Sequence, residues 1–129
     1  MVAPLDNSPL TRPLVAVVDD DAGVRGSLDS LLRSEGLTSI GFARAEDLLA
    51  SDLLRHVTTF VTDLHMPGMT GLAMQAELRR RNCPQPVIVM TGYPTDAAKE
   101  QAMSAGASAF LSKPIDPDVL LAAIVAGLN

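Results

Sequence analysis

Five short apolar runs, separated by segments of helical periodicity, constrain the fold of this 129-residue chain more than any other feature. Most of the runs lack the polar residue at every second position that marks a strand with one face in water, so we expect burial on both faces. Strands that alternate with helices join by right-handed crossovers into a parallel sheet with helices on both sides. The sequence therefore predicts one α/β domain, a doubly wound five-stranded parallel sheet, with strands at Leu14–Val18, Thr38–Phe42, Phe60–Asp63, Val87–Met90 and Ala109–Ser112.

The segments between these runs are typical of helices that cover a sheet. The clearest signal is the i, i+4, i+7, i+8 spacing of Val24, Leu28, Leu31 and Leu32, with Gly36 as the stop. In the helix predicted at about Thr70–Arg81, Gln75 interrupts the apolar face. The remaining helices are predicted at Ala45–Leu54, at about Thr70–Arg81, from an N-cap at Thr95 or Asp96 to about Gly106, and around Leu121, Ile124, Val125 and Leu128.

Length and composition indicate one domain with a short lead. Residues 1–13 contain three prolines among polar residues and show no period, so we expect a flexible N-terminal lead and a domain over residues 14–129. A chain of this length has room for one core.

Charge and cysteine content exclude several classes of function. The net charge of −5 argues against direct nucleic-acid binding, and the basic run Arg79, Arg80 and Arg81 fits a solvated helix end. Cys83 is the single cysteine, which precludes an intramolecular disulfide and fits a reducing compartment. No run approaches the roughly 18 apolar residues of a membrane helix, and no signal peptide is visible, so we expect no membrane association and a cytoplasmic location.

Acidic residues follow two of the predicted strands. Asp19, Asp20 and Asp21 come directly after the first strand, and Asp63 closes the third. Taken alone, the first group also fits the first turn of a helix, and Asp63 also fits the cap of a turn. Carboxylates gathered in a partly dry site repel one another unless a cation offsets their charge. The pattern therefore predicts a divalent metal, and Mg²⁺ is the ion that prefers such hard oxygen ligands.

Polar residues also follow the fourth and fifth strands. Thr91 ends one of these runs and Lys113 follows the other, directly before Pro114. Ligands of an open parallel sheet bind at the carboxyl ends of its strands. We therefore expect Thr91 and Lys113 to share one crevice with Asp19, Asp20 and Asp63.

Four motifs together resemble the receiver domain of two-component response regulators. They are Val17–Asp21, Thr62–Gly71, Val89–Gly92 and Ser112–Pro114, and the resemblance covers residues 14–129. It implies the flavodoxin-like topology of that family. The motifs are most similar to the branch that often carries a C-terminal helix-turn-helix effector, although the chain contains no such effector.

The resemblance implies a role for each residue of the site. Asp63 would accept the phosphoryl group, and Mg²⁺ would be held by Asp63, by Asp20 directly, by Asp19 mainly through water, and by the backbone carbonyl of His65. Thr91 would hydrogen-bond a phosphoryl oxygen, and Lys113 would pair with the carboxylate or the phosphoryl group. Thr91 and Phe110 would form the switch. Pro114 would follow a cis peptide bond, and His65 and Tyr93 would tune how quickly the phosphoryl group is lost.

The function that follows is a phosphorylation-controlled signalling switch rather than an enzyme. A sensor histidine kinase or phosphotransfer protein would phosphorylate Asp63 in a Mg²⁺-dependent reaction. The readout would be the face of the fourth helix, fifth strand and fifth helix, toward a downstream protein, a fused effector or a phosphorylation-dependent dimer.

Three alternatives use similar folds. A pseudo-receiver would bind proteins without phosphorylation, but it has no need for clustered carboxylates. A phosphohydrolase of the haloacid dehalogenase type would place a second aspartate two residues after the nucleophile, where this chain has His65. A nucleotide-binding fold would show a glycine-rich phosphate loop after the first strand, where this chain has three aspartates.

Overall fold

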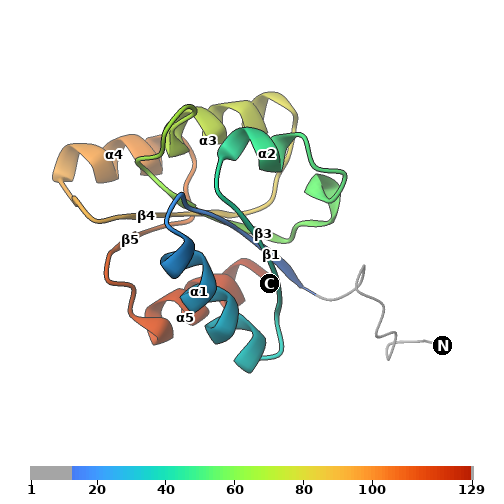
Figure 1. The fold of residues 1–129 in the computed structure, drawn as a ribbon. Coiled ribbons are helices and arrows are strands. Elements are labelled where there is room, and N and C mark those ends of the chain that lie inside the picture. Colours follow the sequence, from blue (N-terminus) through green and yellow to red (C-terminus); the bar gives the residue numbers. More distant parts are fainter. Residues whose placement is uncertain (1–12, 129) are drawn as a thin grey trace.

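The predicted α/β class and strand order along the chain are confirmed by the computed structural model, which describes residues 13–128 (Figure 1). Apart from Pro13, the expected flexible lead lies outside the described residues. The elements are β1 (Leu14–Val18), α1 (Ala22–Ser34), β2 (Thr38–Phe42), α2 (Ala45–Leu49), a 3₁₀ turn (Leu54–His56), β3 (Thr59–Asp63), α3 (Gly71–Arg80), β4 (Val87–Thr91), α4 (Asp96–Ser104), β5 (Ala109–Ser112) and α5 (Pro117–Leu128).

All strand pairs are parallel, and the sheet order is β2-β1-β3-β4-β5. This is the flavodoxin-like order, in which the chain reverses its winding direction between β1 and β3. In the pairing of β1 with β3, Val18 lies opposite Thr62. The residues that follow, Asp19 and Asp63, therefore leave the sheet side by side at the edge where such folds bind ligands.

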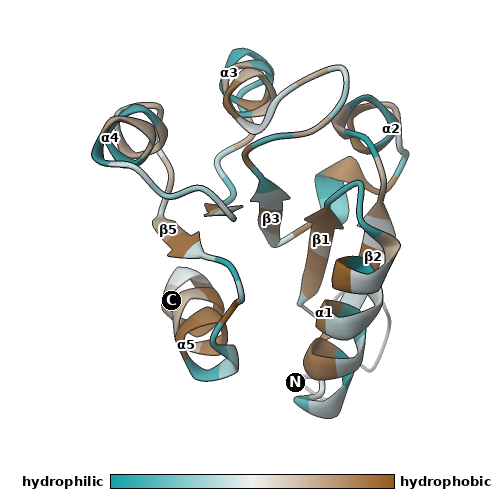
Figure 2. Ribbon diagram, turned by 60° about the vertical axis from the view of Figure 1, so that its left-hand side comes forward, coloured by the Kyte–Doolittle hydropathy of each residue, from teal (hydrophilic) through white to brown (hydrophobic). Residues whose placement is uncertain are grey.

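Two apolar layers cover the sheet. On one face, α2, α3 and α4 lie over Ala16, Val18 and Phe60, and on the other face α1 and α5 lie over Val15 and Val17 (Figure 1). In Figure 2, brown apolar residues line the strands and the inner sides of the helices. β1, β3 and β4 are buried along their whole length, which explains why their sequences lack polar alternation.

The predicted second helix was too long. α2 ends at Leu49, not at Leu54, because Ser51 turns the chain: its amide donates to the Leu48 carbonyl at 3.0 Å, and its Oγ accepts from the Leu53 amide at 3.1 Å. The side chain of a serine competes with helical hydrogen bonds in this way. Leu54 is still buried, but it reaches the core from a 3₁₀ turn.

The other helix boundaries agree with the sequence pattern. The Thr70 side chain caps α3 and the Thr95 side chain caps α4, each accepting from the amide three residues on. Gln75 faces inward and is only 4% exposed, although it breaks the apolar pattern of α3. Arg80 and Arg81 lie at the end of α3 and pair with Glu77, whose pKa they lower to about 2 chiefly through the hydrogen bond from Arg80.

Gly71, the first residue of α3, is required by close packing against the site. A Cβ there would lie 2.6 Å from the Asp63 carbonyl oxygen and 3.0 Å from the Leu64 Cα, and backbone atoms cannot easily move away. We expect Gly71→Ala to destabilise the fold by about 2 kcal/mol, the size of a typical overpacking cost. Chemical denaturation monitored by circular dichroism measures this loss.

Gly26→Ala is the matched control for this substitution. Gly26 lies inside α1, and a Cβ there would meet nothing within 4 Å. Alanine in a helix interior is better than glycine by about 0.5–1 kcal/mol, so this variant should be more stable than the native chain. Equal stabilities for the two variants would contradict the packing described for Gly71.

Candidate metal centre at the carboxyl ends of the strands

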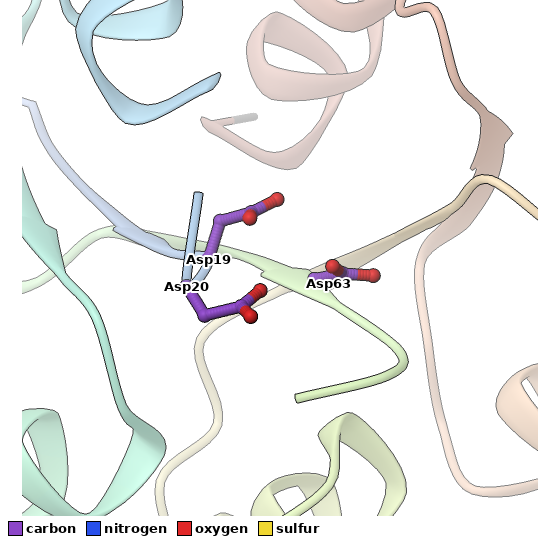
Figure 3. A group of neighbouring side chains, drawn as sticks. All are labelled: Asp19, Asp20 and Asp63. Carbon is purple, nitrogen blue, oxygen red and sulfur yellow. The ribbon is translucent and has the colours of Figure 1, made fainter. Parts of the chain in front are cut away.

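Three carboxylates from two neighbouring strands gather at one edge of the sheet. Asp19 and Asp20 follow β1, Asp63 ends β3, and one carboxylate oxygen of each lies within 4.8 Å of the others (Figure 3). Asp19 and Asp63 are 0% and 6% exposed, whereas Asp20 is exposed to solvent. The site is therefore open on the side of Asp20 and closed beneath Asp19.

Lys113 supplies the positive charge that this cluster needs. Its Nζ donates to Asp19 Oδ2 at 2.7 Å and to Asp63 Oδ2 at 3.1 Å. Partial burial alone would lower the pKa of Lys113, but the hydrogen bonds to Asp19 and Asp63 raise it above its usual value. The side chain is thus held as an ammonium between two carboxylates.

The backbone fixes where Lys113 points. Its amide donates to the Thr91 carbonyl at 2.8 Å, which ties the end of β5 to the end of β4. The Lys113–Pro114 peptide bond is cis, as the resemblance led us to expect.

The three consecutive aspartates have different surroundings. Asp21 caps α1: its Oδ1 accepts from the Gly23 and Val24 amides at 2.7 and 3.2 Å. Asp19 Oδ1 accepts from the Asp21 amide at 2.9 Å. The alternative reading as a helix cap therefore holds for Asp21, while Asp19 and Asp20 turn toward Asp63.

Arg25 and Glu46 lie near the site, although no role is predicted for either residue from the sequence. Arg25 donates from Nη1 to the Asp19 carbonyl at 2.6 Å and so holds the end of β1. Glu46 accepts from the Met69 amide at 3.4 Å and from Arg44 at 3.3 Å, which fastens the loop between β3 and α3 to α2. Hydrogen bonding lowers the pKa of Glu46, most strongly from its own backbone amide. A basic residue one helical turn after the aspartates was the available clue to Arg25.

His65 and Tyr93 form the outer rim. The His65 amide donates to Asp63 Oδ1 at 3.3 Å, while its side chain is exposed and meets Tyr93 edge-on, with ring centroids 6.2 Å apart and an angle of 68°. Tyr93 is 78% exposed. The two rings thus come together from the loops that follow β3 and β4.

Thr91 and Phe110 lie deeper. Thr91 is fully buried, and its Oγ1 accepts from the Tyr93 amide at 3.0 Å. Phe110 is half-buried and lines an open hollow of about 440 Å³ beside the start of α4, together with Pro94, Thr95, Asp96, Lys99 and Ser112. Thr91 contacts neither Asp63 nor Lys113 through a side-chain hydrogen bond among the residues described.

The donor set fits a hard divalent cation. It consists of carboxylate oxygens close enough to share one ion, at an open edge where water can complete the coordination. Neither histidine nor cysteine contributes a side chain to this cluster among residues 13–128, so the set does not resemble a zinc centre.

Comparison with known proteins agrees with this geometry. The response regulator receiver domain family matches residues 15–125 of the chain. Nodulation protein W of Bradyrhizobium diazoefficiens is 40% identical over 116 residues, which cover 90% of this chain and 51% of that protein. The transcriptional regulatory protein FixJ of Azorhizobium caulinodans is 40% identical over 115 residues, covering 89% and 54%. The chain therefore spans about half the length of these two relatives.

Solved structures show the same fold. The response regulator StyR superposes with a TM-score of 0.80 at 38% identity, covering 92% of this chain and 60% of that one. A response regulator receiver protein from Pseudomonas putida gives a TM-score of 0.81 at 30% identity, covering 90% and 98%. Within residues 13–128 no helix is both long and apolar enough to span a bilayer. With the acidic cluster and Lys113 at the edge of a five-stranded parallel sheet, the chain belongs to the response regulator receiver domain family.

Proposed function

We propose that the chain is a phosphorylation-controlled switch that accepts a phosphoryl group on Asp63 from the phosphohistidine of a sensor kinase or phosphotransfer protein. One observation carries this proposal: Asp63 lies within 4.8 Å of two other carboxylates and 3.1 Å from the Lys113 ammonium. Receiver domains are signalling switches rather than enzymes. We therefore propose that the only reactions this chain assists are its own phosphorylation and dephosphorylation.

The reaction needs a nucleophile and charge neutralisation. A carboxylate oxygen of Asp63 would form the new bond to phosphorus as the bond from phosphorus to the donor imidazole nitrogen breaks, and the departing imidazole takes up a proton. Asp19, Asp20, Asp63 and the His65 carbonyl would hold Mg²⁺, which supplies charge neutralisation to the phosphoryl oxygens. Lys113 already contacts the attacking carboxylate and would stabilise the same oxygens.

A macromolecular donor would dock beside Lys113. An open hollow of about 480 Å³ adjoins this residue, and its lining includes the apolar residues Val24, Leu28, Pro114 and Ile115 besides Asp21, Gly23 and Ser27. Apolar walls beside a charged centre are a surface on which a partner helix can rest while its histidine reaches Asp63.

The switch would start from Thr91. A phosphoryl group on Asp63 adds charge and acceptor oxygens at the strand ends, and the Thr91 hydroxyl and the Gly92 loop would move toward them. Phe110 would fill the space that Thr91 leaves. This changes the face of α4, β5 and α5, where a downstream protein, an effector domain or a second copy of the chain would bind.

Beryllofluoride, which mimics the phosphoryl group, tests the proposal. With Mg²⁺ present, we expect the amide NMR signals of the Asp63, Thr91 and Lys113 loops and of the α4-β5-α5 face to shift. A pseudo-receiver would show no shift anywhere, and that result would refute the proposal. Shifts confined to the three loops would support phosphorylation but would contradict the switch.

A pair of rim residues is expected to set the lifetime of the phosphorylated state. His65 and Tyr93 meet at the mouth of the site. We propose that they limit the approach of water to a phosphoryl group on Asp63, so we expect His65→Ala with Tyr93→Ala to raise the rate of autodephosphorylation by about tenfold, the factor that corresponds to ~1.4 kcal/mol. The decay of phosphoprotein after removal of the donor measures this rate.

His56→Ala is the control for the rim pair, because His56 is an exposed histidine in the 3₁₀ turn that follows α2. This variant should decay at the native rate. An unchanged rate in the double variant would show that the rim does not control the lifetime.

A further inference from the structure

Helix α3 holds α4 at its C-terminal end through two side chains. Gln75 Nε2 donates to the Ala102 carbonyl at 3.2 Å, and Arg79 Nη2 donates to the Ala105 carbonyl at 2.8 Å. Gln75 and Arg79 are one turn apart on α3, and the two carbonyls are in the last turn and the C-cap of α4. Carbonyls at a helix end lack helical partners, and the carbonyl of the C-cap residue Ala105 is one of these. The Ala102 carbonyl also accepts from the Ala107 amide at 3.0 Å, so Gln75 is its second donor.

Gln75 is buried, and its hydrogen bond to the Ala102 carbonyl does more than fill space between α3 and α4. Its side chain is 4% exposed, and its Oε1 has no partner among the described residues. An unpaired buried oxygen costs free energy, and leucine would satisfy the apolar pattern of α3 at this position. Only the NH₂ group of this amide is used among the described residues, and that group reaches α4.

Gly106 makes room for the second contact. It follows the C-cap of α4 with φ +100°, and a Cβ there would overlap Arg79 Nη2. The guanidinium therefore lies directly over the backbone that leaves α4. Both donors act on the segment from Ala102 to Gly106.

The N-terminal half of α4 contributes no fully buried residue. Ala98 is half-buried there, whereas Ala102 in the C-terminal half is fully buried, and the other residues of the helix, Gln101, Met103 and Ser104 included, are exposed. The hollow of about 440 Å³ lined by Phe110 adjoins this half. Thr95, the N-cap, is also only four residues from Thr91, which is where the proposed switch starts.

We infer that Gln75 and Arg79 form a clasp that makes the C-terminal turn of α4 a pivot, so that the switch tilts the N-terminal half of α4 over the hollow beside Phe110. The clasp positions α4 in both states and confines the change to one end of the helix. This inference rests on the proposed function for the cause of the tilt, while the clasp itself exists without phosphorylation.

Hydrogen exchange on the unphosphorylated chain tests the clasp by itself. The variant Gln75→Leu with Arg79→Met keeps the volume of both side chains and removes both donors. We expect the amides of Ala105, Gly106 and Ala107 to exchange about tenfold faster than in the native chain, because two hydrogen bonds that oppose local opening are lost. Arg80→Met is the matched control, because among residues 13–128 the Arg80 side chain pairs only with Glu77 on its own helix. Native protection in the double variant would overturn the clasp.

Beryllofluoride with Mg²⁺ then tests the pivot. In the native chain, the amides from Thr95 to Lys99 should shift, and those from Ala105 to Ala107 should shift much less. In the double variant, the shifts should extend to the C-terminal turn. Equal shifts at both ends of the native helix would overturn the pivot. A native chain with no shift even around Asp63 would instead refute the proposed function, and the exchange result would still decide whether the clasp exists.

Discussion

Asp63→Asn is expected to lower the rate of phosphorylation by acetyl phosphate in the presence of Mg²⁺ by more than about 10³-fold. The amide keeps the shape of the side chain but has no anionic oxygen to attack phosphorus. Removing one carboxylate from a cluster whose members lie within 4.8 Å also relieves repulsion, so the variant should fold at least as stably as the native chain. Loss of phosphorylation can then be assigned to chemistry rather than to unfolding.

Two matched variants make this result specific. Asp20→Asn removes a predicted metal ligand but leaves the nucleophile, so its phosphorylation should be slow at low Mg²⁺ and should recover as Mg²⁺ is raised. Asp63→Asn should not recover at any Mg²⁺ concentration. Asp47→Asn, an exposed carboxylate on α2, should behave like the native chain. Recovery of Asp63→Asn by added Mg²⁺ would contradict the assignment of the nucleophile.

Lys113→Met is expected to change both the stability of the fold and the rate of phosphorylation. Without Mg²⁺ it leaves the buried Asp19 carboxylate and Asp63 without a cation, which should destabilise the fold by about 3 kcal/mol. Mg²⁺ should then stabilise the variant more than it stabilises the native chain, because the ion no longer shares the carboxylates with an ammonium. Phosphorylation should nevertheless be about 100-fold slower, because the phosphoryl oxygens lose a preorganised donor.

The control for Lys113→Met and its pH dependence follow from the same contacts. Lys99→Met removes an exposed lysine on α4 and should have neither effect. The pKa of Lys113 is raised in the folded chain, so its contribution is complete below the ordinary value of 10.5 and is lost as pH rises through the higher folded value. The stability difference between native and Lys113→Met should therefore be constant around neutral pH and shrink only in strong alkali. A difference that disappears near neutral pH would contradict the ion pairs.

The strand ends were predictable because burial on both faces leaves a strong signal. β1 is a continuous apolar run and β3 lacks polar alternation, so Asp19, which follows β1, and Asp63, which ends β3, could be placed at the sheet edge. Lys113 could be placed at the same edge because it follows the short run Ala109–Ser112, although β5 is only half-buried. Their mutual distances depend on strand order and register, which the local pattern does not contain.

Other features depend on side-chain geometry that the pattern does not encode. The end of α2 depends on the Ser51 hydroxyl, which accepts from a nearby backbone amide and so favours a turn over a longer helix. The apolar pattern does not show whether a serine makes such a bond. Gln75 interrupts the apolar pattern of α3, yet it is buried because its amide reaches a carbonyl on α4. The sequence also does not show that Asp21 caps a helix while Asp19 and Asp20 lie beside Asp63. This difference depends on the three-dimensional structure.

Peptide mapping by mass spectrometry after treatment with acetyl phosphate and Mg²⁺ tests the central claim most directly. We predict that one phosphoryl group per chain is carried by the peptide that contains Asp63, and that it is released by hydroxylamine, as an acyl phosphate should be. No phosphoryl group under these conditions, or one attached to any other residue, would contradict the assignment of this strand-end aspartate as the acceptor.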